Sequence, residues 1–261
     1  MTDKITTETR EHLLLIGLNR AEARNRIDTE MIRGLAAAYT KLSENRDLRC
    51  GVIFAEGDDF CLGLDLPEVA PRVVQGGIGT LIEEGQVDPW GIATPPCTKP
   101  IVFAAHGRCF TAALELALAG DVIVAASNTV FGQMEVMRGI FPLGGATFRL
   151  PAAIGWHAAM RYILTGDTFD AQEAQRWGLV SDVTEPGGQL DAAIEIATRI
   201  AHNAPLGVQA TLVNARMALR DGIAAAAADL VPRGIGLFST SDTQEGILSL
   251  IERRPAKFTG E

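Results

Sequence analysis

Two glutamates occur in segments where a carboxylate is costly to bury. Glu115 lies within residues 107–121, which read GRCFTAALELALAGD, and Glu135 lies within residues 131–145, which read FGQMEVMRGIFPLGG. Small and apolar residues surround both carboxylates, so burial would be unfavourable without a purpose. Such surroundings shift carboxylate pKa values, and shifted values suit general acid and base catalysis. The sequence therefore marks Glu115 and Glu135 as a candidate acid–base pair.

A third segment adds a possible binding element for a ligand oxygen. Residues 57–66 read GDDFCLGLDL and follow an apolar run, so they predict a glycine-containing turn at the end of a strand. Backbone N–H groups in such a turn could point at a ligand oxygen. Together the three segments indicate an enzyme.

Composition narrows the class of protein further. The chain has 261 residues, of which 47% are hydrophobic and 21% charged, a balance typical of globular proteins large enough for a sizeable core. The net charge of −9 disfavours nucleic-acid partners and anionic membranes. No apolar run is long enough for a transmembrane helix, and the N-terminus does not resemble a signal peptide, so we expect a cytoplasmic protein.

Cysteine and histidine usage gives no sign of a metal site. The four cysteines show no paired spacing and the four histidines are scattered along the chain. Cys61 and Cys109 flank the candidate site segments without a base at a recognisable spacing. We interpret both thiols as small packing groups.

Apolar runs alternate with helical patterns over the first three-quarters of the chain. Strands are predicted at residues 12–18, 50–55, 101–105, 121–126 and 179–183. Helices are predicted at residues 28–45, 112–119, 152–164, 170–177 and 189–203, with Asp28 as the N-cap of the first. This alternation predicts an α/β fold with a mostly covered sheet.

Two regions depart from that alternation. Residues 67–96 are rich in Gly and Pro without a sustained period, which predicts an irregular loop. After residue 204 only helical patterns appear, at 205–220, 221–230 and 241–253. The chain therefore divides into a core, residues 1–204, and a C-terminal helical region, residues 205–261.

The order of these motifs resembles the crotonase superfamily, whose best-known branch is enoyl-CoA hydratase. The resemblance covers essentially the whole chain and includes LNRAEARN at 18–25, FCLGLD at 60–65, both glutamate segments and WGLV at 177–180. It implies a spiral of repeated ββα units, followed by a helical region that covers the site and forms trimers. The implied assembly is a homotrimer or a dimer of trimers.

The same resemblance implies a reaction and roles for particular residues. The backbone N–H groups of Leu62 and Ala112 would polarise the thioester oxygen of an acyl-CoA and stabilise the enolate that forms. Glu115 would activate a water molecule, and Glu135 would deliver a proton to the α-carbon. These roles describe a hydratase that needs no metal and no cofactor beyond the coenzyme A of its substrate.

Further residues are implied as contacts of the CoA thioester: Arg24, Gly63, Leu64, Asp65, Lys257 and Phe258. Asp65 is also expected to cap the segment that follows it. Trp90 and Phe141 either line the acyl pocket or serve packing.

The sequence departs from the family pattern at the second oxyanion segment. Thr111, Ala112 and Ala113 stand where many hydratases have three glycines, and Leu62 stands where alanine is common. The donors are backbone amides, so Ala112 supplies one provided that its φ stays negative. The larger side chains would narrow the space beside the reacting carbons.

Other functions compatible with the pattern are double-bond isomerisation, thioester hydrolysis and acyl-CoA binding without catalysis. Retention of both Glu115 and Glu135 favours hydration over these alternatives.

Overall fold

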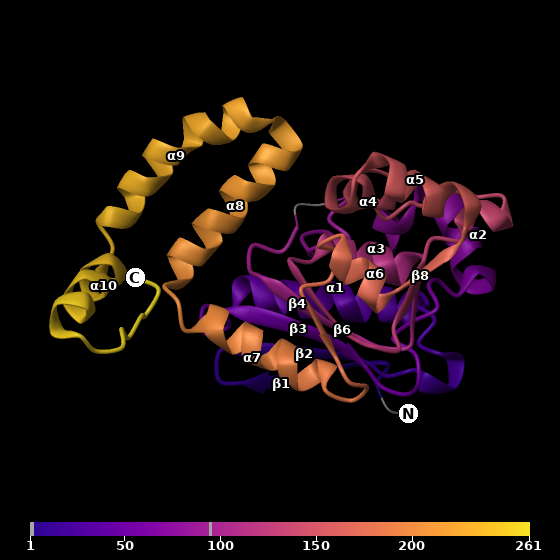
Figure 1. Ribbon diagram of the computed structural model, residues 1–261, viewed down its shortest axis with the longest axis horizontal. Coiled ribbons are helices and arrows are strands. Elements are labelled where there is room, and N and C mark those ends of the chain that lie inside the picture. Colours follow the sequence, from indigo (N-terminus) through magenta and orange to yellow (C-terminus); the bar gives the residue numbers. More distant parts are fainter. Residues whose placement is uncertain (1–2, 94–95) are drawn as a thin grey trace.

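The computed structural model describes residues 3–93 and 96–261, and its core is a six-stranded sheet (Figure 1). The strands run in the order β1-β2-β3-β4-β6-β9. All neighbouring pairs are parallel except β1 with β2. Their bounds are β1 (Ile5–Arg10), β2 (Leu13–Leu18), β3 (Cys50–Ala55), β4 (Ile101–Ala105), β6 (Val122–Ala126) and β9 (Asp182–Thr184). The predicted α/β class is confirmed.

Helices cover the two faces of this sheet. On β2, Leu14 and Ile16 belong to the cluster that contains α1 (Thr29–Glu44), whereas Leu13 and Leu15 pack with α7 (Gln189–Ala201). All six β2 residues are buried, as a continuous apolar run predicts for a strand covered on both sides. Asp28 caps α1, because its side chain accepts a hydrogen bond from the backbone N–H of Met31.

A second, three-stranded sheet holds the candidate site segments. It consists of β5 (Arg108–Phe110), β7 (Val130–Gly132) and β8 (Thr168–Asp170), with β7 in the centre. β5 leads into α3 (Ala112–Ala119), and β7 leads into the short 3-10 helix η3 (Glu135–Arg138). Because β5 and β7 are hydrogen-bonded neighbours, the elements that carry Glu115 and Glu135 start side by side.

Several predicted element bounds are wrong. The predicted loop 67–96 contains α2 (Leu66–Gly76) and η2 (Ile78–Leu81), while residues 94–95 lie outside the described part of the chain. The predicted helix 152–164 is instead two helices, α4 (Ala146–Ile154) and α5 (Trp156–Thr165). Gly155 separates them with a φ of +84°, a value incompatible with a continuous helix. The remaining core helix, α6 (Ala171–Arg176), matches the prediction closely.

Strands β1, β5, β7 and β8 were not predicted. β1 reads ITTETR and leaves its last four residues exposed, since it forms the polar edge of the sheet. β5, β7 and β8 span only three residues each, too few for a pattern of alternation to emerge.

The C-terminal region forms a helical arm that extends from the core (Figure 1). It comprises α8 (Pro205–Asp221), α9 (Ile223–Phe238) and α10 (Ser241–Glu252), so α9 continues well beyond the predicted 221–230. Arg216 anchors the arm by donating to the Cys97 carbonyl at 2.6 Å and to the Asp121 carboxylate at 2.8 Å. Among the described residues, no helix is both long and apolar enough to cross a membrane.

Candidate active site

A cavity of about 560 Å³ lies where the turn after β3, the start of α3 and η3 meet. Glu115 and Glu135 both line it, together with Leu62 and Ala112. The remaining walls are largely apolar, with Leu64, Leu66, Pro67, Phe110, Met134, Ile140, Phe141 and Leu143. The fold therefore brings the two glutamates and both candidate oxyanion segments to one cavity.

Glu115 is held from behind by backbone donors. Its Oε1 accepts hydrogen bonds from the N–H groups of Gly144 at 2.8 Å and Ala146 at 3.1 Å, and the residue is only 3% exposed. Burial raises the pKa of Glu115, and these hydrogen bonds oppose that rise because they favour the charged form. The arrangement suits a carboxylate that must be ionised to take a proton.

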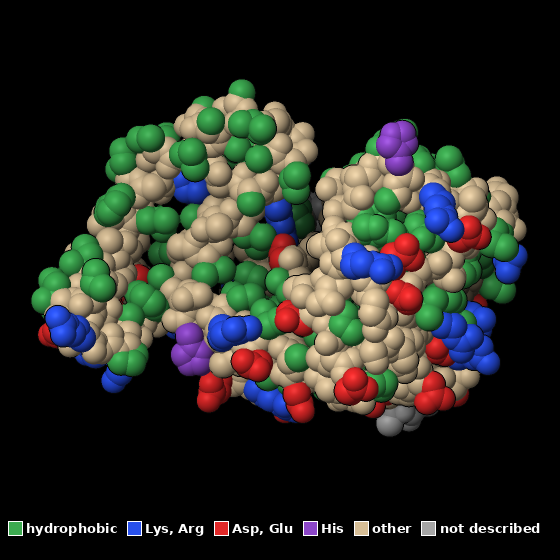
Figure 2. Space-filling view, viewed as in Figure 1, with side chains coloured by type: hydrophobic (Ala, Val, Ile, Leu, Met, Phe, Trp, Pro, Cys, Tyr) green, Lys and Arg blue, Asp and Glu red, His purple; other side chains and the backbone are tan. Residues whose placement is uncertain are grey.

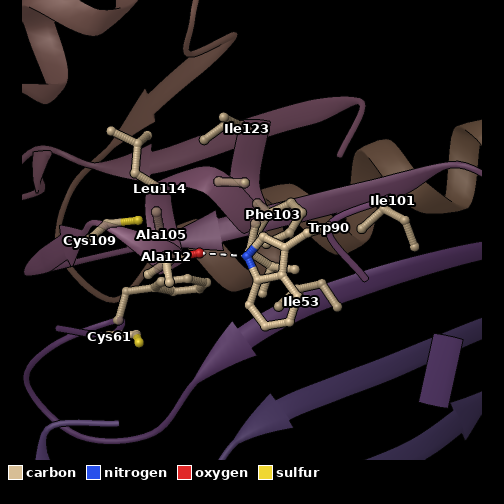
Figure 3. Close-up of a cluster of buried hydrophobic side chains, with 14 of the residues drawn as sticks. Ile53, Cys61, Trp90, Ile101, Phe103, Ala105, Cys109, Ala112, Leu114 and Ile123 are labelled. Atoms are coloured by element: carbon tan, nitrogen blue, oxygen red, sulfur yellow. Dashed lines mark hydrogen bonds between the residues drawn. The ribbon is translucent and has the colours of Figure 1, made fainter. Parts of the chain in front are cut away.

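Arg149 and Trp90 fix the turn that supplies those donors. The Arg149 guanidinium donates to the carbonyl of Gly144 and to that of Trp90, both at 2.8 Å. The Trp90 indole N–H in turn donates to the Ala112 carbonyl at 2.9 Å, as Figure 3 shows. Trp90 thus serves packing, and it joins the Glu115 helix to the 144–146 turn. Arg149 was missed because nothing local in its sequence distinguishes it from a surface arginine.

Glu135 has a different environment. It opens η3 and is 9% exposed, and its Oε2 is buried without a hydrogen-bond partner among the described residues. The side-chain nitrogen of Gln133 lies 3.5 Å from the other oxygen, a long contact. Burial raises the pKa of Glu135 to about 7, and the charge of Glu115 acts in the same direction. Glu135 is therefore protonated in a large fraction of molecules at neutral pH.

The Ala112 amide has no hydrogen-bond acceptor among the described residues, as expected of a candidate oxyanion donor. Ala112 is the first residue of α3, where an N–H has no intrahelical acceptor, and it donates to no other described residue. Thr111 before it has φ 54° and ψ −121°, a conformation that strains a β-branched residue. The positive φ in this segment therefore occurs at Thr111 and not at Ala112.

Leu62 also lines the cavity, but its amide already makes a hydrogen bond within the chain. Its N–H donates to the Arg24 carbonyl at 3.3 Å, longer than usual for a backbone hydrogen bond. A ligand oxygen would have to share or replace this weak bond. The following residue, Gly63, has φ +88°, and a Cβ there would lie 1.8 Å from Thr111 Oγ1. Only glycine allows the two oxyanion segments to approach this closely.

The predicted CoA contacts divide into two groups. Leu64 and Asp65 line the cavity, whereas Arg24, Gly63, Lys257 and Phe258 do not. Lys257 borders a separate pocket beside α10. The Phe258 carbonyl accepts a hydrogen bond from Arg49 at 2.7 Å. Within one chain, the C-terminal residues are therefore not brought to the two glutamates.

Asp65 does not cap α2 with its side chain. It occupies the N-cap position, but its carboxylate makes no capping hydrogen bond and pairs instead with Arg20 at 2.9 Å. Arg20 also lies 3.4 Å from Asp28, so one arginine joins the turn after β3 to the start of α1.

The cavity contains residues that sequence reasoning missed. Arg26 and Arg138 line it, as do Phe110 and Met134, while Phe141 lines it as one of its two interpretations predicted. Arg138 lies three positions after Glu135 within η3, a spacing that could have identified it had the 3-10 turn been predicted. Among the described residues, no group of three or more His, Cys, Asp or Glu side chains could hold a metal ion.

Comparison with known proteins identifies the family. The family model for enoyl-CoA hydratase/isomerase matches residues 8–261. The chain belongs to the enoyl-CoA hydratase/isomerase family. It is 34% identical to the (E)-benzylidenesuccinyl-CoA hydratase of Thauera aromatica, over 98% of this chain and 99% of that protein. It is 30% identical to the 2,3-dehydroadipyl-CoA hydratase of Escherichia coli (strain K12), over 96% of each.

Solved structures of this family share the fold of the chain. A probable enoyl-CoA hydratase/isomerase from Mycobacterium abscessus has a TM-score of 0.95 and 44% identity, covering 99% of each chain. An enoyl-CoA hydratase from Mycobacterium tuberculosis H37Rv has a TM-score of 0.90 and 35% identity, covering 100% of each. The predicted crotonase-type fold is confirmed, and the chain is an enzyme of the enoyl-CoA hydratase type.

Proposed function

We propose that this enzyme adds water across the 2,3-double bond of an acyl-CoA thioester. One observation carries the proposal: two buried glutamates line one cavity, and two backbone N–H groups donate to the carboxylate of Glu115. Burial raises the pKa of both carboxylates. The N–H groups of Gly144 and Ala146 oppose that rise at Glu115, whereas burial raises the pKa of Glu135 to about 7 and the charge of Glu115 adds to this rise. Hydration needs one carboxylate as a base and one carboxylic acid as a proton donor.

The proposed reaction follows from these states. Ionised Glu115 takes a proton from water while the water oxygen bonds to C3, and the electrons of the double bond move towards the thioester oxygen. The N–H groups of Ala112 and Leu62 stabilise the resulting enolate, and a single pre-aimed donor of this kind contributes about 3 kcal/mol in a well-studied hydrolase. Protonated Glu135 then delivers its proton to C2, which completes the 3-hydroxyacyl-CoA.

The position of two C-terminal residues, Lys257 and Phe258, suggests how coenzyme A is bound. Lys257 and Phe258 lie away from the cavity of their own chain, and Figure 1 places α10 at the opposite end of the molecule from α2. We infer that these two residues contact the CoA moiety bound to another copy in a trimer or a dimer of trimers. Arg24, which is exposed near the turn after β3, would contact the same moiety within its own chain.

Family membership does not specify the acyl group of the substrate, since relatives are named for acyl groups as different as (E)-benzylidenesuccinyl and 2,3-dehydroadipyl.

The test of the proposed hydration is a turnover screen with 2-enoyl-CoA thioesters of increasing length, in which the products are separated and identified. Formation of 3-hydroxyacyl-CoA supports hydration. Release of free CoA would indicate thioester hydrolysis, and a shifted double bond would indicate isomerisation; either as the main product would contradict the proposal.

A further inference from the structure

One wall of the cavity carries an arginine that the proposed hydration does not use. Arg138 is the last residue of η3 and lines the cavity. Its side chain donates a long hydrogen bond of 3.4 Å to the carbonyl of the adjacent Met137, and it pairs with no carboxylate in the described part of the chain. A guanidinium without an internal partner is available to an anionic ligand.

The geometry of η3 places this guanidinium relative to the reacting atoms. In a 3-10 helix, residues three positions apart lie on the same face, separated by about 6 Å along the axis. Arg138 therefore follows Glu135 on one face of η3. A substrate atom protonated by Glu135 would have Arg138 one turn further along that wall.

The proposed position of the thioester in the cavity decides which part of the substrate reaches Arg138. In the proposed reaction the thioester oxygen would lie at the Leu62 and Ala112 amides, and the carbons C2 and C3 would lie between the two glutamates. The CoA moiety leaves from the sulfur side of the thioester. With that placement, Arg138 at the end of η3 would meet the remainder of the acyl chain and not the CoA phosphates.

The residues that follow Arg138 complete a wall of mixed character. Ile140, Phe141 and Leu143 line the cavity with apolar side chains, which suit methylene groups. An arginine beside such a wall suits an acyl chain that is apolar along its length and carries a negative charge at its far end. An acyl carboxylate near Glu135 would otherwise meet a cavity that already holds three acidic residues, Asp65, Glu115 and Glu135, and the guanidinium offsets that repulsion.

We propose that Arg138 binds a carboxylate at the far end of a short acyl chain, so that the preferred substrates are mono-CoA thioesters of unsaturated dicarboxylic acids. This substrate class rests on the proposed hydration, since it uses the same placement of the thioester. The arginine acts as a specificity determinant, and the proton transfers remain with Glu115 and Glu135.

The test uses two substrates of equal length that differ at the chain end. 2,3-Dehydroadipyl-CoA ends in a carboxylate and 2-hexenoyl-CoA ends in a methyl group. We expect the wild-type enzyme to favour the dehydroadipyl substrate about 10- to 100-fold in kcat/KM, the range for one hydrogen-bonded charged group. In Arg138→Gln the ratio should fall to about 1, whereas Arg138→Lys should keep part of it as a point charge.

Arg176→Gln is the matched control, because Arg176 is an exposed arginine that does not line the cavity. Its ratio should equal that of the wild type. A wild-type ratio near 1, an Arg138→Gln variant that keeps the preference, or loss of the preference in Arg176→Gln would overturn the assignment.

Binding of saturated analogues separates this proposal from the proposed function. Adipyl-CoA and hexanoyl-CoA cannot be hydrated, so calorimetry measures their Kd values whatever reaction the enzyme catalyses. Tighter binding of adipyl-CoA to the wild type, lost in Arg138→Gln, would support the carboxylate site even if neither enoyl-CoA were hydrated. Equal Kd values for the two analogues would overturn the site even if both enoyl-CoAs were hydrated.

Discussion

The two glutamates differ in what surrounds their carboxylates. Glu115 accepts two backbone hydrogen bonds that stabilise its charge, whereas one Glu135 oxygen is buried without a partner among the described residues. Burial raises the pKa of both carboxylates, and the backbone donors oppose that rise at Glu115, which suits Glu115 to the base role and Glu135 to the acid role. The difference arises from the folded backbone, since both residues are glutamates in apolar segments.

Replacing either glutamate by glutamine should remove one proton transfer. We expect Glu115→Gln and Glu135→Gln each to lower kcat about 10²- to 10⁴-fold, the usual contribution of one acid or base group. Glutamine is nearly isosteric, so the Kd of a saturated acyl-CoA should change little. Steady-state rates and calorimetry measure both quantities. Exposed Glu44→Gln is the control, and a nearly normal kcat in either site variant would exclude that residue from catalysis.

The protonation of Glu135 should also control the pH dependence of hydration. The acid role requires the protonated form, and burial raises the pKa of Glu135 to about 7. The kcat/KM for hydration should therefore fall as pH rises through about 7, because the fraction of protonated Glu135 decreases. A pH–rate profile between about pH 5 and 9 measures this. A rate that rises with pH over that range would assign Glu135 to the base role instead.

Sequence reasoning identified Glu115 and Glu135 because their apolar segments and their resemblance to the family motifs agreed. It could not identify Arg149, whose role depends on the carbonyls of Gly144 and Trp90, residues far apart in the chain. It also could not place Lys257, since its distance from the cavity depends on how the helical arm is directed.

At the level of elements, the start of α3 is the most unusual feature of the fold. Thr111 adopts φ 54° and ψ −121° so that Ala112 can begin the helix with its N–H free. Strained conformations of this kind persist where the surrounding structure holds them, often at functional sites. Here Thr111 is held by the hydrogen bond from its N–H to the Gly132 carbonyl at 2.8 Å.

Glycine at position 111 should relieve this strain. A residue held in such a conformation costs about 1–3 kcal/mol, and the greater unfolded-state entropy of glycine offsets about 0.4–1 kcal/mol of the relief. We therefore expect Thr111→Gly to be about 1 kcal/mol more stable than Thr111→Ala, since both lose the hydroxyl and γ-methyl groups but only glycine accepts the conformation. Urea unfolding of the two variants measures the difference. Equal stability, or a more stable alanine variant, would show that Thr111 is not strained.

The elements that sequence patterns predicted well are those with many residues to define a period. The boundaries of β2, β3, β4 and α3 agree with prediction within one residue. The three-residue strands of the second sheet and the helix α2 did not follow from local patterns. Their positions depend on pairing and packing with distant segments, which periodicity does not record.

For the whole molecule, the helical arm exposes far more apolar surface than an isolated protein usually does. Figure 2 shows hydrophobic side chains along much of its length. Highly exposed examples are Leu219, Ile223, Phe238, Leu250 and Ile251. Contiguous apolar surface of this extent marks a protein interface. This observation supports the proposed trimer or dimer of trimers.

Combining two variants in one assembly should test both the oligomeric state and the role of Lys257. If Lys257 serves the cavity of another copy, trimers that combine Lys257→Ala with Glu135→Gln subunits contain some complete sites. Co-expression of the two should restore part of the activity that each lacks alone, while light scattering reports a trimer or hexamer. Glu115→Gln mixed with Glu135→Gln is the control without recovery, because both residues line the cavity of one chain. A stable monomer at micromolar concentration, or no recovery in the first mixture, would contradict the arrangement.

Labelling the attacking oxygen tests hydration at this cavity most directly. A 2-enoyl-CoA substrate is incubated with the enzyme in H₂¹⁸O, and mass spectrometry locates the label in the product. We expect ¹⁸O in the C3 hydroxyl of a 3-hydroxyacyl-CoA, formed rapidly by the wild type and about 10²- to 10⁴-fold more slowly by Glu115→Gln. Label in the carboxylate of a released acid, or equal labelling rates in the two enzymes, would contradict it.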